Sequence, residues 1–259
     1  MTARHDVGAD SGLSSRVERL RSRWDEHGRT DPMWAVLTDP EKVGGRWEPE
    51  QFYAHGKAEI GRLMGRFEEL GVGQQRECAL DFGCGVGRLT NALAEHYEHV
   101  DGVDISAEMV KRAAEMAPNR DRCTFHTNVA PDLAMFSDDH FDLVHSNIVL
   151  QHVGPDLTRA YLREFARIVK PGGVVHFQLP VKPVPGLIGL GLQIVPRPIL
   201  NRIRRGMSMH GMPETRVHAM LYSRGLNVVA TDPDESAGHG WISRRYTATK
   251  PSLGTSNGS

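Results

Sequence analysis

The sequence has few cysteines and almost no net charge, and both shortages exclude classes of protein. Its 259 residues include three cysteines, Cys78, Cys84 and Cys123, which cannot all pair within one chain. None of them has the paired spacing of a metal site, so we expect reduced thiols and a cytoplasmic protein. The formal net charge is −1, which gives no general attraction for nucleic acid or for an anionic membrane.

Long apolar runs are also missing. No segment has the unbroken apolar length of a membrane span, and residues 1–15 lack the apolar stretch of a secretory signal. We therefore expect no stable membrane insertion and a single large domain over residues 13–250. The expected subdivisions are disordered tails at 1–12 and 251–259, an N-terminal helical cap at 13–50, and a lid-like insertion at 181–212.

The most informative stretch that is present runs from Ala79 to Leu89. A short apolar run ends in Asp81, and glycines follow at alternate positions, Gly83, Gly85 and Gly87, before an amphipathic helix pattern begins. Glycine adopts positive φ and lets a ligand lie against bare backbone. Open α/β sheets bind ligands at the carboxyl ends of their strands, so this turn predicts a site for a nucleoside-like cofactor.

The glycine spacing narrows the choice of cofactor. The pattern is G-x-G-x-G, which differs from the dinucleotide fingerprint G-x-G-x-x-G and from the phosphate loop. Residues 99–105 predict a second strand that ends at Asp104, about 20 residues beyond the turn, where a carboxylate can accept hydrogen bonds from ribose hydroxyls. Taken alone, Asp104 would equally be a helix cap, but beside the glycines it favours ribose binding.

Five motifs, in order, resemble those of the class I S-adenosylmethionine (SAM)-dependent methyltransferases. They are Leu80–Gly87, Val103–Ser106, Phe141–Val144, Leu150–Val153 and Ile168–Gly173. The resemblance implies an α/β, Rossmann-like, doubly wound sheet of seven strands, parallel with an antiparallel edge strand. A likeness to sugar- and natural-product-modifying O-methyltransferases is looser.

Hydrophobic patterns place the elements of this fold. Strands are expected at 77–81, 99–103, 123–127, 140–145, 173–179, 228–230 and 242–249. Helices are expected at 13–24, along a stripe that ends at Gly71, and at 86–97, 106–116, 157–169 and 213–223.

The resemblance also implies which residues bind SAM and its product S-adenosylhomocysteine (SAH). Gly83 and Gly85 let the backbone approach the methionine portion, with Cys84 as a small residue between them. Asp81 orders the turn and is placed to meet the ammonium group. Asn147, after the fourth strand, borders the methionine end of the cofactor.

The adenine and the cover over it involve positions with alternatives. Ile105 and Met109 are placed to pack on the adenine, although at helical spacing both also suit the core. The segment Asn128–Val129–Ala130 stands where the family commonly has an aspartate for the adenine amino group. The carbonyl oxygen of Asn128 can still accept that bond. Phe52 and Gly56 belong to a segment that resembles the cover of the cofactor, or else they are ordinary packing at a helix start.

The methyl acceptor is predicted from the residues after the fourth strand. Residues 146–149 lack the Asn/Asp-Pro-Pro-Tyr motif of enzymes that methylate nucleobase or amide nitrogen, which favours a hydroxyl acceptor. Such a hydroxyl must lose its proton. Histidine as a residue type has a pKa near neutrality and suits general-base work, so His152 is the candidate general base. The alternative is a histidine that caps the adjoining turn. Further candidates for acceptor contacts are Trp34, Gln151, His210 and Trp241.

Two variable segments flank this predicted pocket. The early tryptophans, with Arg46 near them, suit a sugar ring or another amphipathic molecule. Residues 186–195 are apolar and are followed by Arg197, Arg202, Arg204 and Arg205. This pattern is compatible with a membrane surface, a lipid-linked acceptor or a phosphate, but a lid with a solvated basic flank is preferred.

The sequence therefore predicts transfer of a methyl group from SAM to a hydroxyl of a small molecule, such as a glycoside or a secondary metabolite. The alternatives are N- or C-methylation of a small molecule, a regulatory protein that binds SAM or SAH without catalysis, and a nucleic-acid methyltransferase. The near-zero charge disfavours the last of these. No compact metal signature is present, so a divalent ion of the kind that some sugar O-methyltransferases use has no assigned ligands.

Overall fold

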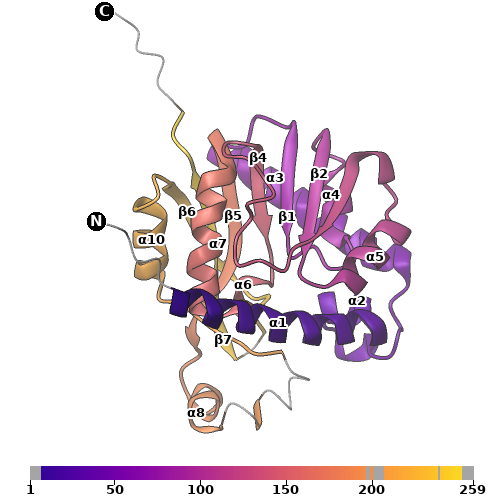
Figure 1. The fold of residues 1–259 in the computed structure, drawn as a ribbon, viewed down its shortest axis with the longest axis vertical. Coiled ribbons are helices and arrows are strands. Elements are labelled where there is room, and N and C mark those ends of the chain that lie inside the picture. The colour runs from indigo at the N-terminus through magenta and orange to yellow at the C-terminus, as the bar shows by residue number, and fades with distance from the viewer. Residues whose placement is uncertain (1–6, 197–198, 201–206, 239, 253–259) are drawn as a thin grey trace, which may run out of the picture.

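Figure 1 shows a computed structural model of the chain, which describes residues 7–196, 199–200, 207–238 and 240–252. Helix α1 (Val7–Thr30) begins before residue 13, where we expected the ordered domain to start. The remaining parts of the two expected tails, 1–6 and 253–259, lie outside the described residues. So do Arg197, Arg202, Arg204 and Arg205 of the predicted basic flank.

The centre of the fold is one seven-stranded sheet, which confirms the predicted architecture. Its strands are β1 (Cys78–Phe82), β2 (His99–Asp104), β3 (Cys123–Thr127), β4 (Phe141–Ser146), β5 (Val169–Pro183), β6 (Asn227–Asp234) and β7 (Trp241–Thr249). They follow the order β3-β2-β1-β4-β5-β7-β6. Strands β1 to β5 are parallel, whereas β7 is antiparallel to both of its neighbours and lies between β5 and the edge strand β6.

Strand β5 is longer than the predicted 173–179 and includes the first residues of the predicted insertion. Its ladder with β7 continues to the pair Pro183–Trp241, with a register shift between Pro180 and Lys182. Proline cannot donate to a ladder and is usually confined to strand edges and bulges. Here the register shift directly follows Pro180, and the long β7 supplies partners that the local sequence does not reveal.

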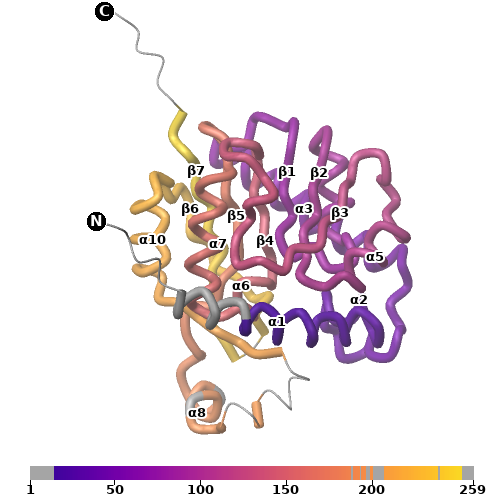
Figure 2. Tube along the Cα trace, in the orientation of Figure 1, coloured from indigo at the N-terminus to yellow at the C-terminus, as the bar shows by residue number. Residues whose placement is uncertain are grey.

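Helices cover both faces of the sheet. After α1 they are α2 (Pro32–Val36), α3 (Pro49–Leu70), α4 (Arg88–Leu93), α5 (Ala107–Met116), α6 (Leu150–Val153), α7 (Pro155–Ile168), α8 (Leu187–Ile194) and α10 (Glu214–Tyr222). The tube in Figure 2 shows α7 in front of the sheet and α3 behind it. Helix α3 ends as predicted at Gly71, whose φ of 66° is left-handed. None of the described helices combines the length and the hydropathy needed to cross a bilayer.

Alternating strand residues fill two cores, one on each face. On the α7 side Phe141, Phe165 and Phe177 are fully buried, and on the α3 side Phe67 and Leu143 are fully buried. Side chains of successive strand residues point to opposite faces, so strands covered on both sides are apolar almost throughout. This continuous burial fixes the strand ends at which the site is built.

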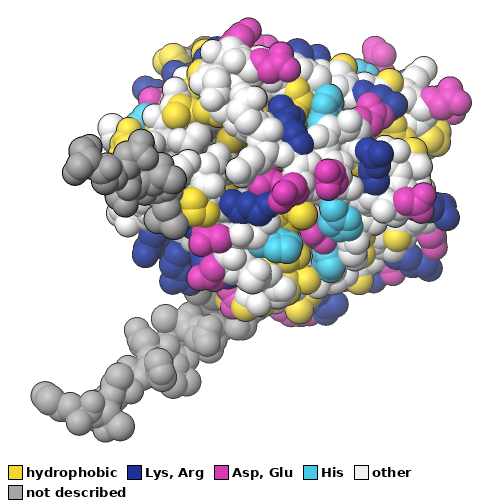
Figure 3. Space-filling model, turned by 90° about the horizontal axis from the view of Figure 1, so that it is seen from above, with side chains coloured by type: hydrophobic (Ala, Val, Ile, Leu, Met, Phe, Trp, Pro, Cys, Tyr) yellow, Lys and Arg dark blue, Asp and Glu magenta, His cyan; other side chains and the backbone are white. Residues whose placement is uncertain are grey.

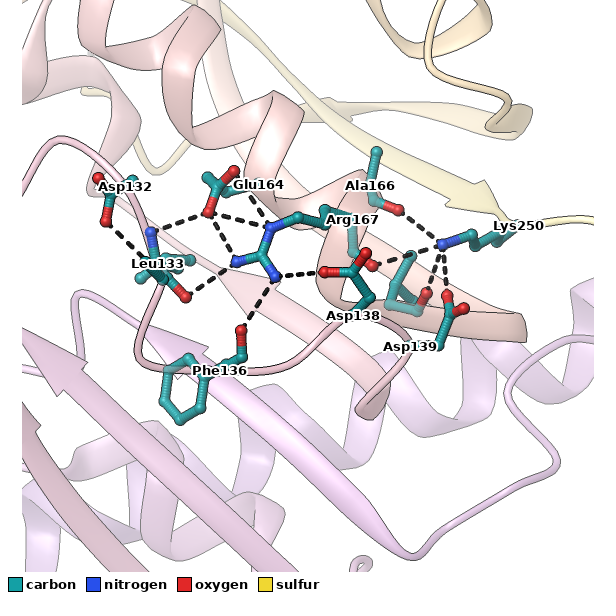
Figure 4. A network of polar contacts seen from close by, with 11 residues as sticks. Asp132, Leu133, Phe136, Asp138, Asp139, Glu164, Ala166, Arg167 and Lys250 are labelled. Atoms are coloured by element: carbon teal, nitrogen blue, oxygen red, sulfur yellow. Dashed lines mark hydrogen bonds and ion pairs between the residues drawn. The ribbon is translucent and has the colours of Figure 1, made fainter.

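A network of polar contacts ties the segment between β3 and β4 to the end of α7 (Figure 4). The guanidinium of Arg167 donates to Asp138 Oδ1 (2.7 Å), to Glu164 Oε2 (2.7 Å) and to the backbone carbonyls of Leu133 and Phe136. Lys250 donates to the carbonyls of Ala166 and Val169 at the same helix end, where a cation also complements the helix dipole. These bonds hold in place the segment that begins beside Asn128.

Candidate cofactor and acceptor pocket

The main pocket lies where the strand order reverses, between the parallel neighbours β1 and β4. From there the sheet extends through β2 and β3 on one side and through β5 on the other. This is the position at which doubly wound sheets bind ligands. The pocket has a volume of about 830 Å³, which includes its open mouth. The ends of β1 and β2 form one wall, and helices α1, α2, α6 and α7 form the others.

The glycine turn after β1 lines this pocket. Gly83 and Gly85 have φ of 79° and 53°, which are left-handed values that favour glycine. A Cβ on Gly83 would lie 2.2 Å from Val149 Cγ2, and one on Gly85 would lie 2.4 Å from Val36 Cγ2. The turn is also pinned to β2, because the N–H groups of Gly83 and Cys84 both donate to the carbonyl of Val103. Only bare backbone fits at the two glycines.

Asp104 faces the turn from the end of β2. Its carboxylate accepts from the Gly85 N–H (2.9 Å) and from the Ser106 N–H (2.8 Å). Burial raises the pKa of Asp104 to about 6, although these two bonds act in the opposite direction. The side chain that caps α5 belongs instead to Ser106, which accepts from the Met109 N–H at 3.2 Å. Asp104 is therefore a partly desolvated carboxylate on the pocket wall.

Four more predicted cofactor residues line the pocket, namely Ile105, Met109, Asn128 and Asn147. The Asn128 side chain shapes its own loop, since it accepts from the Ala130 N–H (3.0 Å) and donates to the Asp132 carbonyl (2.7 Å). Val129 is exposed, and the Ala130 carbonyl accepts from the Tyr161 hydroxyl (2.9 Å).

The other predicted cofactor residues support the turn without lining the pocket. Phe52 is fully buried among the residues of the N-terminal cap. A Cβ on Gly56 would lie 2.6 Å from the Arg88 carbonyl oxygen, so this glycine allows α3 to approach α4. Asp81 accepts from the Thr90 hydroxyl at 2.7 Å. Burial raises the pKa of the Cys84 thiol well above its usual range, which fits a small packing residue and not a nucleophile.

The amide nitrogen of Asn147 has a hydrogen-bond partner, whereas its amide oxygen has none among the described residues. Its Nδ2 donates to Glu59 on α3, and Glu59 also accepts from Arg88 at 2.9 Å. Its Oδ1 is buried without a hydrogen-bond partner among the described residues. A buried unsatisfied carbonyl oxygen is costly, so this atom, on a residue of the pocket wall, is suited to accept from a bound donor.

Ile148, which follows Asn147, also lines the pocket and was not predicted. Its φ of 60° is left-handed, an outlier for a β-branched residue and typical of strain stored at ligand sites. Nothing in the sequence signals this conformation, because isoleucine disfavours it.

His152 lies on the pocket wall, with its ring 5.5 Å from that of Trp24. Nδ1 is 2.7 Å from the Ser208 carbonyl oxygen, and Nε2 is 3.1 Å from Gln151 Nε2. A carbonyl oxygen only accepts, so the proton of the neutral ring is on Nδ1, and Nε2 accepts from the Gln151 amide. His152 therefore presents the tautomer that a base needs, but its lone pair is already engaged.

The four predicted acceptor contacts do not line this pocket. Trp34 lies in a separate depression with residues 26–31, and its Nε1 donates to the Asp39 carbonyl (2.9 Å). Gln151 is buried, and its backbone carbonyl accepts from the backbone N–H of His210 (2.8 Å). Trp241 packs against Gly211. Among the described residues, no cluster of His, Cys, Asp or Glu could hold a metal ion.

Apolar side chains from two helices also line the pocket and form what we call its apolar wall. Val17, Leu20 and Trp24 come from α1, while Leu157 and Tyr161 come from α7. The α1 residues recur at helical spacing, so an amphipathic stripe in the sequence could have indicated them. One pocket is thus lined both by bare backbone, a carboxylate and an amide and by apolar side chains.

Comparisons with known proteins agree with this geometry. Residues 79–173 match the family described as "Methyltransferase domain". A 2-methyl-6-phytyl-1,4-hydroquinone methyltransferase from Synechocystis is 30% identical over 178 residues, which are 68% of this chain and 52% of that protein. A malonyl-(acyl-carrier protein) O-methyltransferase from Salmonella typhimurium is 38% identical over 108 residues, 41% of this chain and 40% of that protein. The chain thus spans about half the length, or less, of these relatives.

Among solved structures, magnesium protoporphyrin IX methyltransferase from Synechocystis PCC 6803 with bound SAH has a similar fold. The TM-score is 0.62 at 21% sequence identity, and the match covers 90% of this chain and 99% of that chain. Similarity at this level of identity establishes the arrangement of strands and helices.

Proposed function

We propose that the chain is a class I SAM-dependent methyltransferase and that it transfers a methyl group from SAM to a small molecule with an apolar body, which the match of residues 79–173 to the methyltransferase domain supports. The observation that carries this proposal is that one pocket is lined both by polar groups at the strand ends and by apolar side chains from α1 and α7. The bare backbone at Gly83 and Gly85, the Asp104 carboxylate and the unpartnered Asn147 Oδ1 match the groups of SAM. The bare backbone suits the methionine chain of SAM, the Asp104 carboxylate suits its ribose, and Asn147 Oδ1 suits its ammonium group.

We propose that the acceptor group is a hydroxyl and that His152 is its base. SAM supplies an electrophilic methyl carbon. The acceptor oxygen forms the new C–O bond as the C–S bond breaks with its electron pair to sulfur. The hydroxyl proton passes to His152 Nε2 after Nε2 has exchanged its hydrogen bond from the Gln151 amide for one from the hydroxyl. The protein's part is to align the two reactants and to hold the base in the required tautomer.

The apolar wall favours an acceptor whose hydroxyl is attached to an apolar ring or chain, rather than a free sugar. Of the early tryptophans that suggested a glycoside, Trp34 and Trp47 lie outside the pocket lining and Trp24 lies within it. The other lining residues from α1 and α7 are apolar or aromatic. A secondary metabolite or a similar amphipathic molecule is therefore the better-supported acceptor. A nucleic acid is not favoured, since charges of both signs are interspersed on the face seen in Figure 3 and the net charge is −1.

The test is transfer of a labelled methyl group from SAM to matched panels of acceptors. The panels are apolar molecules with a free hydroxyl, the same frameworks with an amine instead, and free sugars. We expect label in the first panel. Label only in the amine panel would establish N-methylation, and binding of SAM with no transfer to any panel would favour a regulatory protein.

A further inference from the structure

A chain of buried polar side chains connects His152 to the sheet. Gln151 follows from α6, and Gln178 and Ser243 lie on β5 and β7; each of these four residues is at most 6% exposed. Gln178 Nε2 is 3.2 Å from Gln151 Oε1 and 2.6 Å from Ser243 Oγ. Buried amides are nearly always hydrogen-bonded and have few available partners. The orientation of each amide in the chain therefore determines the orientation of its neighbour.

The direction of every hydrogen bond in the chain follows from its end at Ser208. The Ser208 carbonyl only accepts, so His152 carries its proton on Nδ1 and accepts at Nε2. Gln151 must then direct its NH2 group toward His152 and its carbonyl oxygen toward Gln178. Gln178 donates to that oxygen, and its own Oε1 is buried with no partner among the described residues.

A second arrangement becomes the better one when His152 carries two ring protons. Nε2–H then needs an acceptor, and a half-turn of the Gln151 amide supplies its carbonyl oxygen. The NH2 group of Gln151 now faces Gln178, so a half-turn of that amide brings the previously unpartnered Oε1 into position to accept. The Ser243 hydroxyl either donates or accepts, so it serves both arrangements.

We propose that Gln151 and Gln178 are positioning residues that hold His152 as a proton acceptor, and that their two amides reverse together when His152 is protonated. The inference rests on the proposed role of His152 as the base. The Gln151 amide holds the ring in the Nδ1-protonated tautomer and gives up its bond to Nε2 when the acceptor hydroxyl arrives. After the proton has transferred, the reversed amide stabilises the imidazolium by accepting from Nε2–H. Its test needs neither SAM nor an acceptor, so its failure is distinguishable from failure of the proposed function.

The test uses the full chain labelled with ¹⁵N-histidine, and the His152 signals are assigned by their loss in His152→Asn. In the parent protein at high pH we expect the shifts of a neutral ring protonated at Nδ1. In Gln178→Glu the carboxylate accepts from Gln151 and turns its carbonyl toward His152. At a fixed pH near 6.5 the ratio of imidazolium to neutral His152 should rise about tenfold.

Two controls separate the relay from a simple charge effect. Gln151→Met/Gln178→Glu keeps the new charge but breaks the chain, so the ratio should return close to the parental value. Gln51→Glu makes the same substitution at an exposed position on α3 and should change nothing. Asp104 across the pocket, His27 beside Trp24, His210 and Arg245, the β7 partner of Gln178, are unchanged throughout.

Three results would overturn the proposal. One is a parent ring protonated at Nε2. The second is an unchanged ratio in folded Gln178→Glu, and the third is an equal rise in Gln178→Glu and in the double variant. If Gln178→Glu does not fold, as judged by circular dichroism, the parental tautomer decides alone, because an Nε2-protonated ring is incompatible with the bond directions that the proposal requires.

Discussion

Cofactor binding should release a proton from Asp104, and this consequence can be worked out from the structure. Burial raises the pKa of Asp104 to about 6 in the unliganded protein. Ribose hydroxyls that donate to its carboxylate would favour the ionised form and lower that pKa. Binding of SAH then requires the ionised carboxylate, which is only about a tenth of the population at pH 5 but predominates at pH 7.

The expected effect is therefore an affinity for SAH that is about tenfold weaker at pH 5 than at pH 7. Calorimetry measures it directly. Near pH 6, titrations in buffers of different ionisation enthalpy should show release of about half a proton per SAH bound. Asp104→Asn, which cannot ionise, should bind SAH more weakly at pH 7 and lose both the pH dependence and the proton release.

The same raised pKa has a consequence for the stability of the unliganded protein. The folded chain holds a proton on Asp104 up to about pH 6, whereas the unfolded chain loses it near pH 4. The contribution of Asp104 to the free energy of unfolding is therefore favourable at low pH and is lost as the pH rises from about 4 to 6. The loss is about 2 kcal/mol at most, because the residue is partly exposed. An affinity for SAH that does not change between pH 5 and 7 would refute the reasoning. So would an Asp104→Asn variant whose SAH affinity depends on pH as strongly as that of the parent.

Two other variants test separate parts of the account. His152→Ala should retain SAH binding, because the cofactor end of the pocket is intact, but should lose most turnover in the labelled-methyl assay; turnover within a few-fold of the parent would exclude His152 as the base. Gly56→Ala brings a Cβ to 2.6 Å from the Arg88 carbonyl, so it should lower the free energy of unfolding by about 1–3 kcal/mol. The matched Gly61→Ala, on the same helix with open space around it, should be neutral or stabilising by up to about 1 kcal/mol in thermal or urea unfolding. Equal stability of the two glycine variants would contradict the close approach of α3 to α4.

Local patterns predicted the parts of the fold that local chemistry determines. The third strand was expected at 123–127 and lies there, because its boundaries follow from nearby residues. Gly71 ends α3 because its left-handed φ needs glycine. The turn at Gly83 and Gly85 and the carboxylate at Asp104 were likewise visible in the spacing of the sequence, and all three residues line the pocket.

Contacts between distant segments were not predictable in the same way. Strand β5 continues past Pro180 because β7, more than fifty residues later, provides the ladder. The tautomer of His152 depends on the Ser208 carbonyl. No motif in the sequence predicts that the segment containing Ser208 lies beside α6. Trp34 is conspicuous in the sequence, yet its Nε1 is used within its own loop. Side chains of this kind are assigned by what they contact, which residue type alone does not reveal.

The central claim is that the glycine turn after β1 cradles the cofactor, and titration of the folded protein with SAH tests it most directly. The account predicts saturable binding in the parent and in Gly61→Ala, and loss of binding in Gly83→Ala, whose Cβ would lie 2.2 Å from Val149 Cγ2. No binding by well-folded parent protein, or undiminished binding by Gly83→Ala, would contradict the account.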